Sequence, residues 1–523
     1  MSVADTARLL ETTQPRVTLR NFFEKPFDSA IAAARTCYSS RIISPEEITE
    51  KQRIAIGATT FNGGHHTVFQ HAHFEFGLEN VSRHFVWNFL HSHPFYNSEQ
   101  QSQRYVRLDK ALAFVPPLPE EARELYVRAV ERAWESYRVL AQKLSPRTRE
   151  TLYDVWKITE RTQEKRRQRI ERQVDKKAIE VARYVLPLAT FTTMVHTLSG
   201  VVLHRLYRMR NSGDTPQETA LVVDQMVERV KEIDPQFFER IGSGPLDEEQ
   251  LSERRLTEQS DPAKRDPSLA REEFDRDLGG WTSRLIAATP DAERIAARAF
   301  RAVLGLSERE MDDEQALDEL LNPARNRYRL ETLNVGVHSP MMRSLQHVSY
   351  TFLKKLSHTA DSQDQRHRMV PASRPLLAAT VCSDPDYLVP MLVRGNAEAE
   401  DLYHQAMQEA WQARNQLIAM GVSPSFAVYV LPNAAAVRLV ETGSLLHLLH
   451  KWTMRTCFNA QEEIYAASME ELAQVRQTHP RLARYLGPPC YVRHGLAYPV
   501  CTEGSHFCGV KVWETFPDVE RKL

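Results

Sequence analysis

Hydrophobic and polar residues alternate in two short segments that lie far apart in the chain. Residues 70–76 and 346–352 both read Q-H-x-x-aromatic-x-F, the alternation expected of a half-buried strand. Apolar residues recur instead at helical spacing over 121–144 and 401–420, and Gly421 is placed to end the second of these helices. The pattern therefore predicts a few strands combined with long helices.

Two polar segments add to this picture. Thr215-Pro216-Gln217-Glu218 has the form of a capping box with proline at the first helical position, so a helix is expected to begin there. Residues 159–177 are densely charged. They could form a basic patch, but we interpret them as the solvated face of a helix.

The same short motifs occur twice, in the same order. Tyr-Val-Leu-Pro stands at 184–187 and again at 429–432. After each proline the chain runs the same distance to a Met-Arg pair, which ends at Arg210 in one case and at Arg455 in the other, and a Gln-Glu pair soon follows each. Together with the two Q-H segments, these matches favour a diverged tandem duplication over chance similarity.

The duplication suggests a division of the chain. Residues 243–280 are rich in Asp, Glu, Arg, Ser and Pro and poor in large apolar side chains, which is typical of a linker. The predicted organisation is a first copy at 1–242, a charged linker at 243–280, a second copy at 281–489 and a cysteine-containing tail at 490–523. The predicted fold class is α+β, with each copy a small sheet packed against long helices.

Composition excludes several classes of protein. The 523 residues carry a formal net charge of -1 and a mean hydropathy of -0.46, so no overall field favours nucleic acid or a membrane surface. No apolar run approaches the ~20 residues of a membrane span, and charges interrupt the first 30 residues, where a secretory signal would be apolar. Six cysteines are too few for a disulfide scaffold, so a cytoplasmic protein is expected.

Two clusters could bind anions. In the second copy, Gln363 is followed by Arg366-His367-Arg368, in which two planar guanidinium groups could clamp a phosphate or pyrophosphate. In the first copy, Ser102 and Arg104 could hold one phosphate from two sides. Taken alone, each has a plain alternative, namely solvated surface arginines for the first cluster and a polar loop for the second.

In the context of the repeats, these residues resemble the flavin-dependent thymidylate synthase family. Its signature, R-H-R-x-x-S-x-N-E-x-S-x-R-Y, follows an H-x-x-F-x-F strand and precedes an L-P element and a late arginine. Here the signature is split, and the resemblance runs from Arg35 to about Ile464. The second copy keeps 366–368, whereas the first has His91-Ser92-His93 at that place and recovers the Ser-x-Arg-Tyr end at 102–105.

A rival alignment lays residues 98–104 over 362–368. It would require twelve extra residues between the Q-H strand and the motif in the first copy, so we prefer the split signature.

The resemblance implies an activity and an assembly. Family members are homotetramers that build their sites between subunits, and they use FAD, NADPH and methylenetetrahydrofolate to convert dUMP into dTMP by reductive methylation. A fused pair of copies would then form one composite site, and a homodimer would reproduce the four-domain assembly. The alternatives are a non-catalytic or repurposed flavin- or nucleotide-binding homologue, and a structural protein that keeps only the fold.

The resemblance also implies roles for individual residues, and it leaves open which late arginine contacts the pyrimidine. The residues with implied roles are Arg366, His367, Arg368 and His450 at flavin, Ser102 and Arg104 at the nucleotide phosphate, Gln363, Arg366 and Arg183 at the nucleotide, and Arg210 or Arg455 at the pyrimidine.

The tail concentrates half of the cysteines. Cys490, Cys501 and Cys508 with His506 could supply three thiolates and an imidazole to a tetrahedral zinc ion. Their spacing is not the paired C-x-x-C of common zinc ribbons, so buried free thiols are the alternative.

Overall fold

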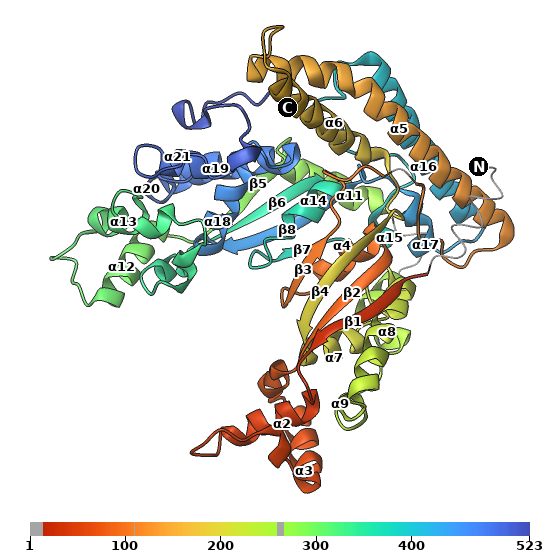
Figure 1. The fold of residues 1–523 in the computed structure, drawn as a ribbon, viewed down its shortest axis with the longest axis vertical. Helices are drawn as coiled ribbons and strands as arrows, with labels where there is room; N and C mark the ends of the chain where they lie inside the picture. Colours follow the sequence, from red (N-terminus) through yellow and green to blue (C-terminus); the bar gives the residue numbers. More distant parts are fainter. Residues whose placement is uncertain (1–13, 109, 259–265) are drawn as a thin grey trace.

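The computed structural model describes residues 14–108, 110–258 and 266–523, which form two four-stranded antiparallel sheets surrounded by helices (Figure 1). The strand order is β1-β2-β4-β3 in the first sheet and β5-β6-β8-β7 in the second, so the two sheets share one topology. This arrangement confirms the predicted α+β fold in two copies. The strands are β1 (Arg16–Phe22), β2 (His73–Ser82), β3 (Tyr96–Gln100), β4 (Phe191–Ser199), β5 (Ser283–Ala288), β6 (Ser349–Ser357), β7 (Ala372–Ser373) and β8 (Ala436–Ser444).

The helices follow the same duplication, with additions in each copy. In the first copy they are α2 (Pro26–Thr36), α3 (Glu50–Asn62), α4 (Arg83–His91), α5 (Glu120–Trp156), α6 (Glu164–Ala182), α7 (Gly200–Arg208), α8 (Pro216–Ile233) and α9 (Gln236–Glu239). After α10 (Ser252–Glu258) and α11 (Pro267–Leu278) come α12 (Ala292–Leu304), α13 (Asp313–Leu321), α14 (His358–Asp364), α15 (Leu377–Thr380), α16 (Ala397–Ala419), α17 (Pro424–Ala427), α18 (Leu445–Arg455), α19 (Glu462–Thr478), α20 (Pro480–Ala483) and α21 (Pro489–Arg493).

The alternating segments form the central strands β2 and β6. Phe74 and Phe76 are fully buried, as are Tyr350 and Phe352 at the matching positions. The Gln-His pairs themselves end a 3-10 turn before each strand, so the strands begin slightly later than the pattern predicts.

Both long helices predicted from periodicity are present. The first, α5, extends twelve residues beyond the predicted end at Leu144. The second, α16, ends where Gly421 adopts the left-handed conformation at φ 84°. Helices α5, α6 and α16 lie side by side along one edge of the molecule (Figure 1), and their buried faces form a single core to which both copies contribute.

The two copies meet where the repeated Tyr-Val-Leu-Pro segments cross. The Leu188 amide donates to the Leu431 carbonyl at 2.8 Å, and Asn433 donates to Leu186 at 2.8 Å. The amide of Ala189 donates to Tyr429 at 2.9 Å, and the equivalent bond from the other copy is also 2.9 Å. This exchange of equivalent bonds relates the copies by a pseudo-two-fold axis.

Side chains repeat the same symmetry. In the first copy, Glu218 accepts from the Ser82 amide at 2.7 Å, from the Ser82 hydroxyl at 2.6 Å and from the Tyr429 hydroxyl at 2.7 Å. In the second, Glu463 accepts from the amide and hydroxyl of Ser357 and from the hydroxyl of Tyr184. Each copy thus satisfies a carboxylate of the other.

The capping box predicted at the start of α8 is wrong. Pro216 does occupy the first turn, but the Thr215 side chain makes no cap bond to the helix. The Glu218 carboxyl group is instead bonded to Ser82 and Tyr429, which together supply three donors, whereas the cap would supply one.

The segment predicted as a linker contains helices α10 and α11. Residues 259–265 of it lie outside the described residues. Ion pairs hold helix α11 against the second sheet, because Asp275 pairs with Arg438 at 2.5 Å and with Lys355 at 3.0 Å. Farther on, residues 490–523 pack on the second copy through Cys490, Val512 and Phe516.

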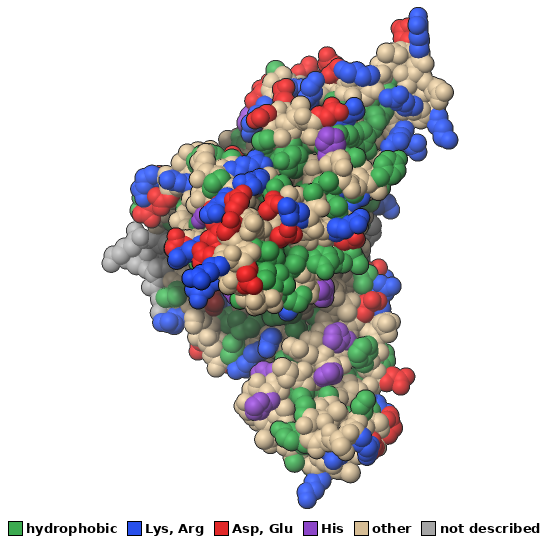
Figure 2. Space-filling view, turned by 90° about the vertical axis from the view of Figure 1, so that its left-hand side faces the viewer, with side chains coloured by type: hydrophobic (Ala, Val, Ile, Leu, Met, Phe, Trp, Pro, Cys, Tyr) green, Lys and Arg blue, Asp and Glu red, His purple; other side chains and the backbone are tan. Residues whose placement is uncertain are grey.

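The surface mixes charges of both signs. On the face shown in Figure 2, Lys and Arg side chains alternate with Asp and Glu, and histidines are scattered over the lower part. Among the described residues, we find no helix with the length and apolar character needed to cross a membrane.

The buried Glu218 makes stability depend on pH. Burial raises its pKa from 4.5 to about 7, although its hydrogen bonds oppose the shift. The native state therefore keeps a proton that the unfolded chain releases between these values, and stability falls as pH rises through this window. Compared with E218Q, which cannot ionise, the wild type should lose about 3 kcal/mol of unfolding free energy between pH 4 and 8. Urea denaturation across this range measures the difference, and parallel profiles for the two proteins would contradict it.

Candidate functional site

The Arg-His-Arg segment of the second copy contacts the first copy within one chain. The Arg366 guanidinium forms an ion pair with Glu99 of strand β3 at 2.9 Å. Arg368 donates to the Asn97 side chain at 3.2 Å, and its guanidinium lies 5.0 Å from the centre of the Tyr96 ring. The Arg-His-Arg segment of the second copy therefore faces the strand that leads to Ser102 and Arg104 in the first.

Arg104 is held from both copies. Its Nε donates to Glu180 of α6 at 2.8 Å, and its Nη2 donates to the backbone carbonyl of Asn459 in the second copy at 2.8 Å. The hydroxyl of Ser102 accepts the Arg104 amide at 3.2 Å, which places the serine and the arginine on one turn. Arg183 is buried nearby, where desolvation and the charge of Arg104 lower its pKa against the opposing effect of Glu180.

The two late arginines have different surroundings. Arg455 donates to the Gln363 carbonyl at 3.2 Å, and burial lowers its pKa to about 10, with smaller contributions from the like charges of Arg104 and Arg366. Arg210 instead pairs with Asp224 on α8 at 2.6 Å. The structure therefore brings Arg455, and not Arg210, together with the split motif.

The two candidate histidines lie together, in surroundings that disfavour the protonated form. The ring centres of His367 and His450 are 5.9 Å apart. Burial lowers the pKa of both, and the neighbouring Arg455 lowers both further. A neutral imidazole at these positions offers one N–H donor and one acceptor instead of a third positive charge.

Several polar atoms at this junction have no hydrogen-bond partner within the described parts of the chain. They are Gln363 Oε1, His367 Nε2, Arg455 Nε and Arg183 Nε. Buried polar groups are nearly always satisfied, so each of these atoms is a candidate contact for a polar ligand. The cavity between strand β3 and the two arginines Arg366 and Arg368 has a volume of about 260 Å³, and Arg104 lines a separate, larger cavity.

The corresponding triplet in the first copy has lost its charge. Burial lowers the pKa of His91 to about 3 and that of His93 to about 4, so neither is protonated at neutral pH. Arg366 and Arg368 are the equivalent residues of the second copy. They follow Ser357, the N-cap of α14, by the same number of residues as His91 and His93 follow Ser82, the N-cap of α4. Of the two pseudo-equivalent places, the second copy therefore has the positive charge that an anionic ligand requires.

A fully buried ion cluster lies beneath the end of α14, next to Gln363. Lys354 pairs with Asp364, Glu441 and Glu471 at 2.9 Å each. Lys451 pairs with Asp364 at 2.8 Å and with Glu441 at 2.6 Å. The side chains of all five residues are at most 1% exposed, so each charge depends on its partners.

The first copy has no charged residue at any of these places. Strand register and the serines that begin the helices give the equivalent positions. Taken in the order Lys354, Asp364, Glu441, Glu471 and Lys451, they are Leu78, Phe89, His196, Met226 and Leu206. All five are buried, and burial lowers the pKa of His196 to about 3. The ion cluster is therefore a feature of the copy that contributes the Arg-His-Arg segment.

Sequence reasoning did not single out Asn97, Glu180, Asn459 or the ion cluster. Two signals were available. Asn97 and Glu99 share one face of β3 by their parity, and Lys354 shares the inward parity of Phe352 and Leu356 on β6.

The zinc site predicted in the tail has no support in the structure. Within the described ranges, no group of three His, Cys, Asp or Glu side chains is arranged to hold a metal ion. Cys490, Cys501 and Cys508 pack against the apolar core of the second copy, and burial raises the pKa of Cys490 to about 12. His506 instead accepts a bond from Asn459 through its backbone carbonyl at 2.8 Å. The structure favours free thiols that pack against the core.

The fold and the contacts between the copies define a two-copy α+β protein with an arginine-rich junction. Comparison with known proteins identifies the family. The family model described as thymidylate synthase complementing protein matches residues 18–236 and 284–481. The chain belongs to this family, and the two matched segments are consistent with the tandem duplication inferred from the repeats.

Curated relatives align with at most about one copy of this chain. A flavin-dependent thymidylate synthase of Geobacter sulfurreducens is 30% identical over 231 residues, which is 43% of this chain and 92% of the relative. One from Clostridium tetani is 27% identical over 237 residues, covering 44% and 88%. One from Sulfurisphaera tokodaii is 33% identical over 151 residues, covering 28% and 58%.

The buried ion cluster gives a stability prediction. Replacing Lys451 with methionine leaves Asp364 and Glu441 with Lys354 as their remaining lysine partner, so K451M should lower the unfolding free energy by about 3–5 kcal/mol. The matched control is K165M, at an exposed position of α6, which should change the unfolding free energy by about 0.5 kcal/mol or less. Urea denaturation at pH 7 measures both. A loss below about 1 kcal/mol for K451M would show that the cluster does not need its second lysine.

Proposed function

We propose that this chain catalyses the reductive methylation of dUMP to dTMP at one composite site, using FAD, NADPH and methylenetetrahydrofolate. The observation that carries the proposal is the 2.9 Å contact between Arg366 and Glu99, which brings the Arg-His-Arg segment of the second copy against the strand that leads to Ser102 and Arg104 in the first. The names of the relatives support the flavin and the reaction class. In this proposal, 1–242 and 281–489 are the two copies, 243–280 connects them and 490–523 is an added tail.

The residues of the second copy fit a flavin dinucleotide. Arg366 and Arg368 supply two positive charges for the two negative charges of a pyrophosphate, and the unpartnered His367 Nε2 adds a polar contact. His450 lies against His367 and would complete this wall. Bound flavin supplies the hydride chemistry, so the protein needs no covalent nucleophile.

The remaining residues would bind and orient the nucleotide. Ser102 and Arg104 would hold its phosphate, with Glu180 keeping the Arg104 guanidinium in place. Gln363, Arg183 and Arg455 would face the nucleoside, since each has a buried polar atom without a partner. We assign the pyrimidine contact to Arg455, whose positive charge would stabilise negative charge that develops on the ring.

A second chain would complete the site. The 260 Å³ cavity beside Arg366 and Arg368 lies below the 300–1,000 Å³ typical of ligand pockets, and it is too small for flavin together with a pyrimidine. We therefore propose a homodimer in which the partner chain adds the missing walls. The competing function is a flavin- or nucleotide-binding homologue without turnover, which the uncharged first-copy triplet favours.

Removal of Arg366 should weaken flavin retention. The R366A variant loses a charge-assisted hydrogen bond worth about 1.5–3 kcal/mol, which corresponds to a roughly 10- to 100-fold higher Kd for FAD. The control is R298A, an exposed arginine on α12 in the same copy. Flavin absorbance after equilibrium dialysis measures retention. Equal flavin content in R366A and R298A would remove the second copy from the site, and flavin binding without dTMP formation by the wild type would favour the competing function.

The composite site should not be restored by mixing variants. Arg104 and Arg366 belong to one site in the same chain, so R104A and R366A chains each lack a working site. Co-expressed R104A and R366A should therefore show no more dTMP formation than either variant alone. If the site paired Arg104 of one chain with Arg366 of another, mixed dimers would regain an intact site, and recovered activity would refute the intrachain assignment.

A further inference from the structure

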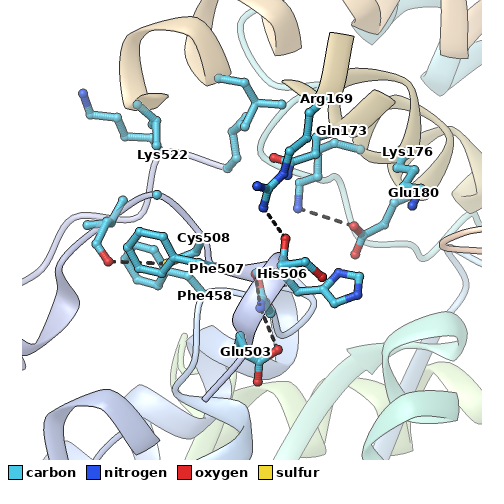
Figure 3. Close-up of a pocket in the computed structure, with 18 of the residues that line it drawn as sticks. Arg169, Gln173, Lys176, Glu180, Phe458, Glu503, His506, Phe507, Cys508 and Lys522 are labelled. Atoms are coloured by element: carbon cyan, nitrogen blue, oxygen red, sulfur yellow. Dashed lines mark hydrogen bonds and ion pairs between the residues drawn. The ribbon is translucent and has the colours of Figure 1, made fainter. Parts of the chain in front are cut away.

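A second, larger cavity lies between helix α6 and the C-terminal segment. Its volume is about 1270 Å³, and Figure 3 shows it bounded by α6 on one side and by residues 503–510 on the other. The end of α5 and residues 458–459 close the remaining sides. Residues 503–523 lie beyond position 481, where the match to the family ends, so one wall of this cavity is an addition of this chain.

The lining carries an excess of positive charge. Eight lysines and arginines line the cavity and only four aspartates and glutamates, a difference of four charges. The cations are Arg104, Lys157, Arg169, Arg172, Lys176, Lys177, Lys511 and Lys522, and the anions are Asp154, Glu180, Glu503 and Glu520.

Three of these cations form one face of α6. Arg169, Arg172 and Lys176 follow at helical spacing, and within the described residues none of them has an acidic side chain within ion-pair distance. Arg169 donates instead to the backbone carbonyl of Ser505, which joins the two walls, and Lys176 lies over the Tyr105 ring at 5.7 Å. All three side chains are exposed, so the charged segment is the solvated helix face predicted from the sequence, and this part of it borders the cavity.

The opposite wall is aromatic and apolar. Phe458 and Phe507 lie beside Cys508, across the cavity from Arg169 and Lys176 (Figure 3). Leu152, Val155 and Val510 extend this wall. The cavity therefore combines an aromatic and apolar surface with a row of cations that have no acidic partner among the described residues, an arrangement that suits a ring attached to several negative charges.

We propose that this cavity binds a nucleoside polyphosphate. Its phosphates would contact Arg169, Arg172 and Lys176, because guanidinium and ammonium groups are the usual phosphate ligands. Its base would lie against Phe458 and Phe507, since aromatic side chains stack on bases of any sequence. The inference goes beyond the proposed reaction. Arg104 and Glu180, which we assign to the phosphate site of dUMP, lie at the edge of this cavity, whereas Gln363 and Arg366 do not line it.

The cavity volume favours this class of ligand over a simple anion. The cavity volume of about 1270 Å³ exceeds the volume of one phosphate. An inorganic polyphosphate has no ring that could pack against the aromatic wall. A chain of linked glutamates would satisfy the cations but would leave the aromatic rings without a planar partner. These two alternatives make different predictions from those of a nucleotide.

The test is ATP binding to the purified full-length chain, measured by isothermal titration calorimetry with and without saturating dUMP. The R172A/K176A variant should bind ATP at least 10-fold more weakly than the wild type, because it loses two contacts to phosphate. The control is R161A/K165A, which removes two exposed charges next to the same face but outside the cavity lining and should bind as the wild type does. Neither pair belongs to the machinery proposed for dUMP.

Three outcomes would overturn the proposal. These are equal ATP affinity in the wild type and R172A/K176A, binding of tripolyphosphate as tight as that of ATP, and binding of hexa-γ-glutamate without binding of ATP. Failure of dTMP formation leaves this readout unaffected, and loss of ATP binding leaves the assay for dTMP unaffected, so the two proposals can fail separately.

Discussion

The crossing of residues 184–189 with 429–434 is the contact on which the rest of the structure depends. Backbone bonds are exchanged there in equivalent pairs, and the shared core closes around them. Glu218 is buried and Glu463 is half-buried beside the crossing, where each accepts bonds from a serine of its own copy and a tyrosine of the other. A separated copy would expose apolar surface and leave a carboxylate short of a donor, so the copies form one structural unit.

Duplication allowed the two copies to diverge around that shared axis. The second copy keeps the Arg-His-Arg segment and a buried ion cluster centred on Lys354 and Lys451, while the first has apolar side chains and a neutral histidine at the cluster positions. Buried charges cost free energy unless every member is paired, so such a cluster contributes more to fixing one conformation than to stability. Its position under the end of α14 makes it suited to hold Gln363 in place.

Local patterns were sufficient for much of the fold and part of the site. Periodicity located β2, β6, α5 and α16, because one face of each element is buried. The expected capping box failed at Glu218, where a tertiary partner took the carboxylate. The zinc hypothesis failed because cysteine spacing alone does not separate ligands from core thiols.

The sequence by itself determined the duplication, the element types and the residue types of the candidate site, since all of these are written in short-range spacing. Only the tertiary structure decided that Arg366 meets Glu99, that Arg455 rather than Arg210 joins Gln363, and that the charged face of α6 borders a cavity. Arg366 and Glu99 are separated by 267 residues. No local pattern encodes such a contact, because it exists only once the two copies have packed around their common axis.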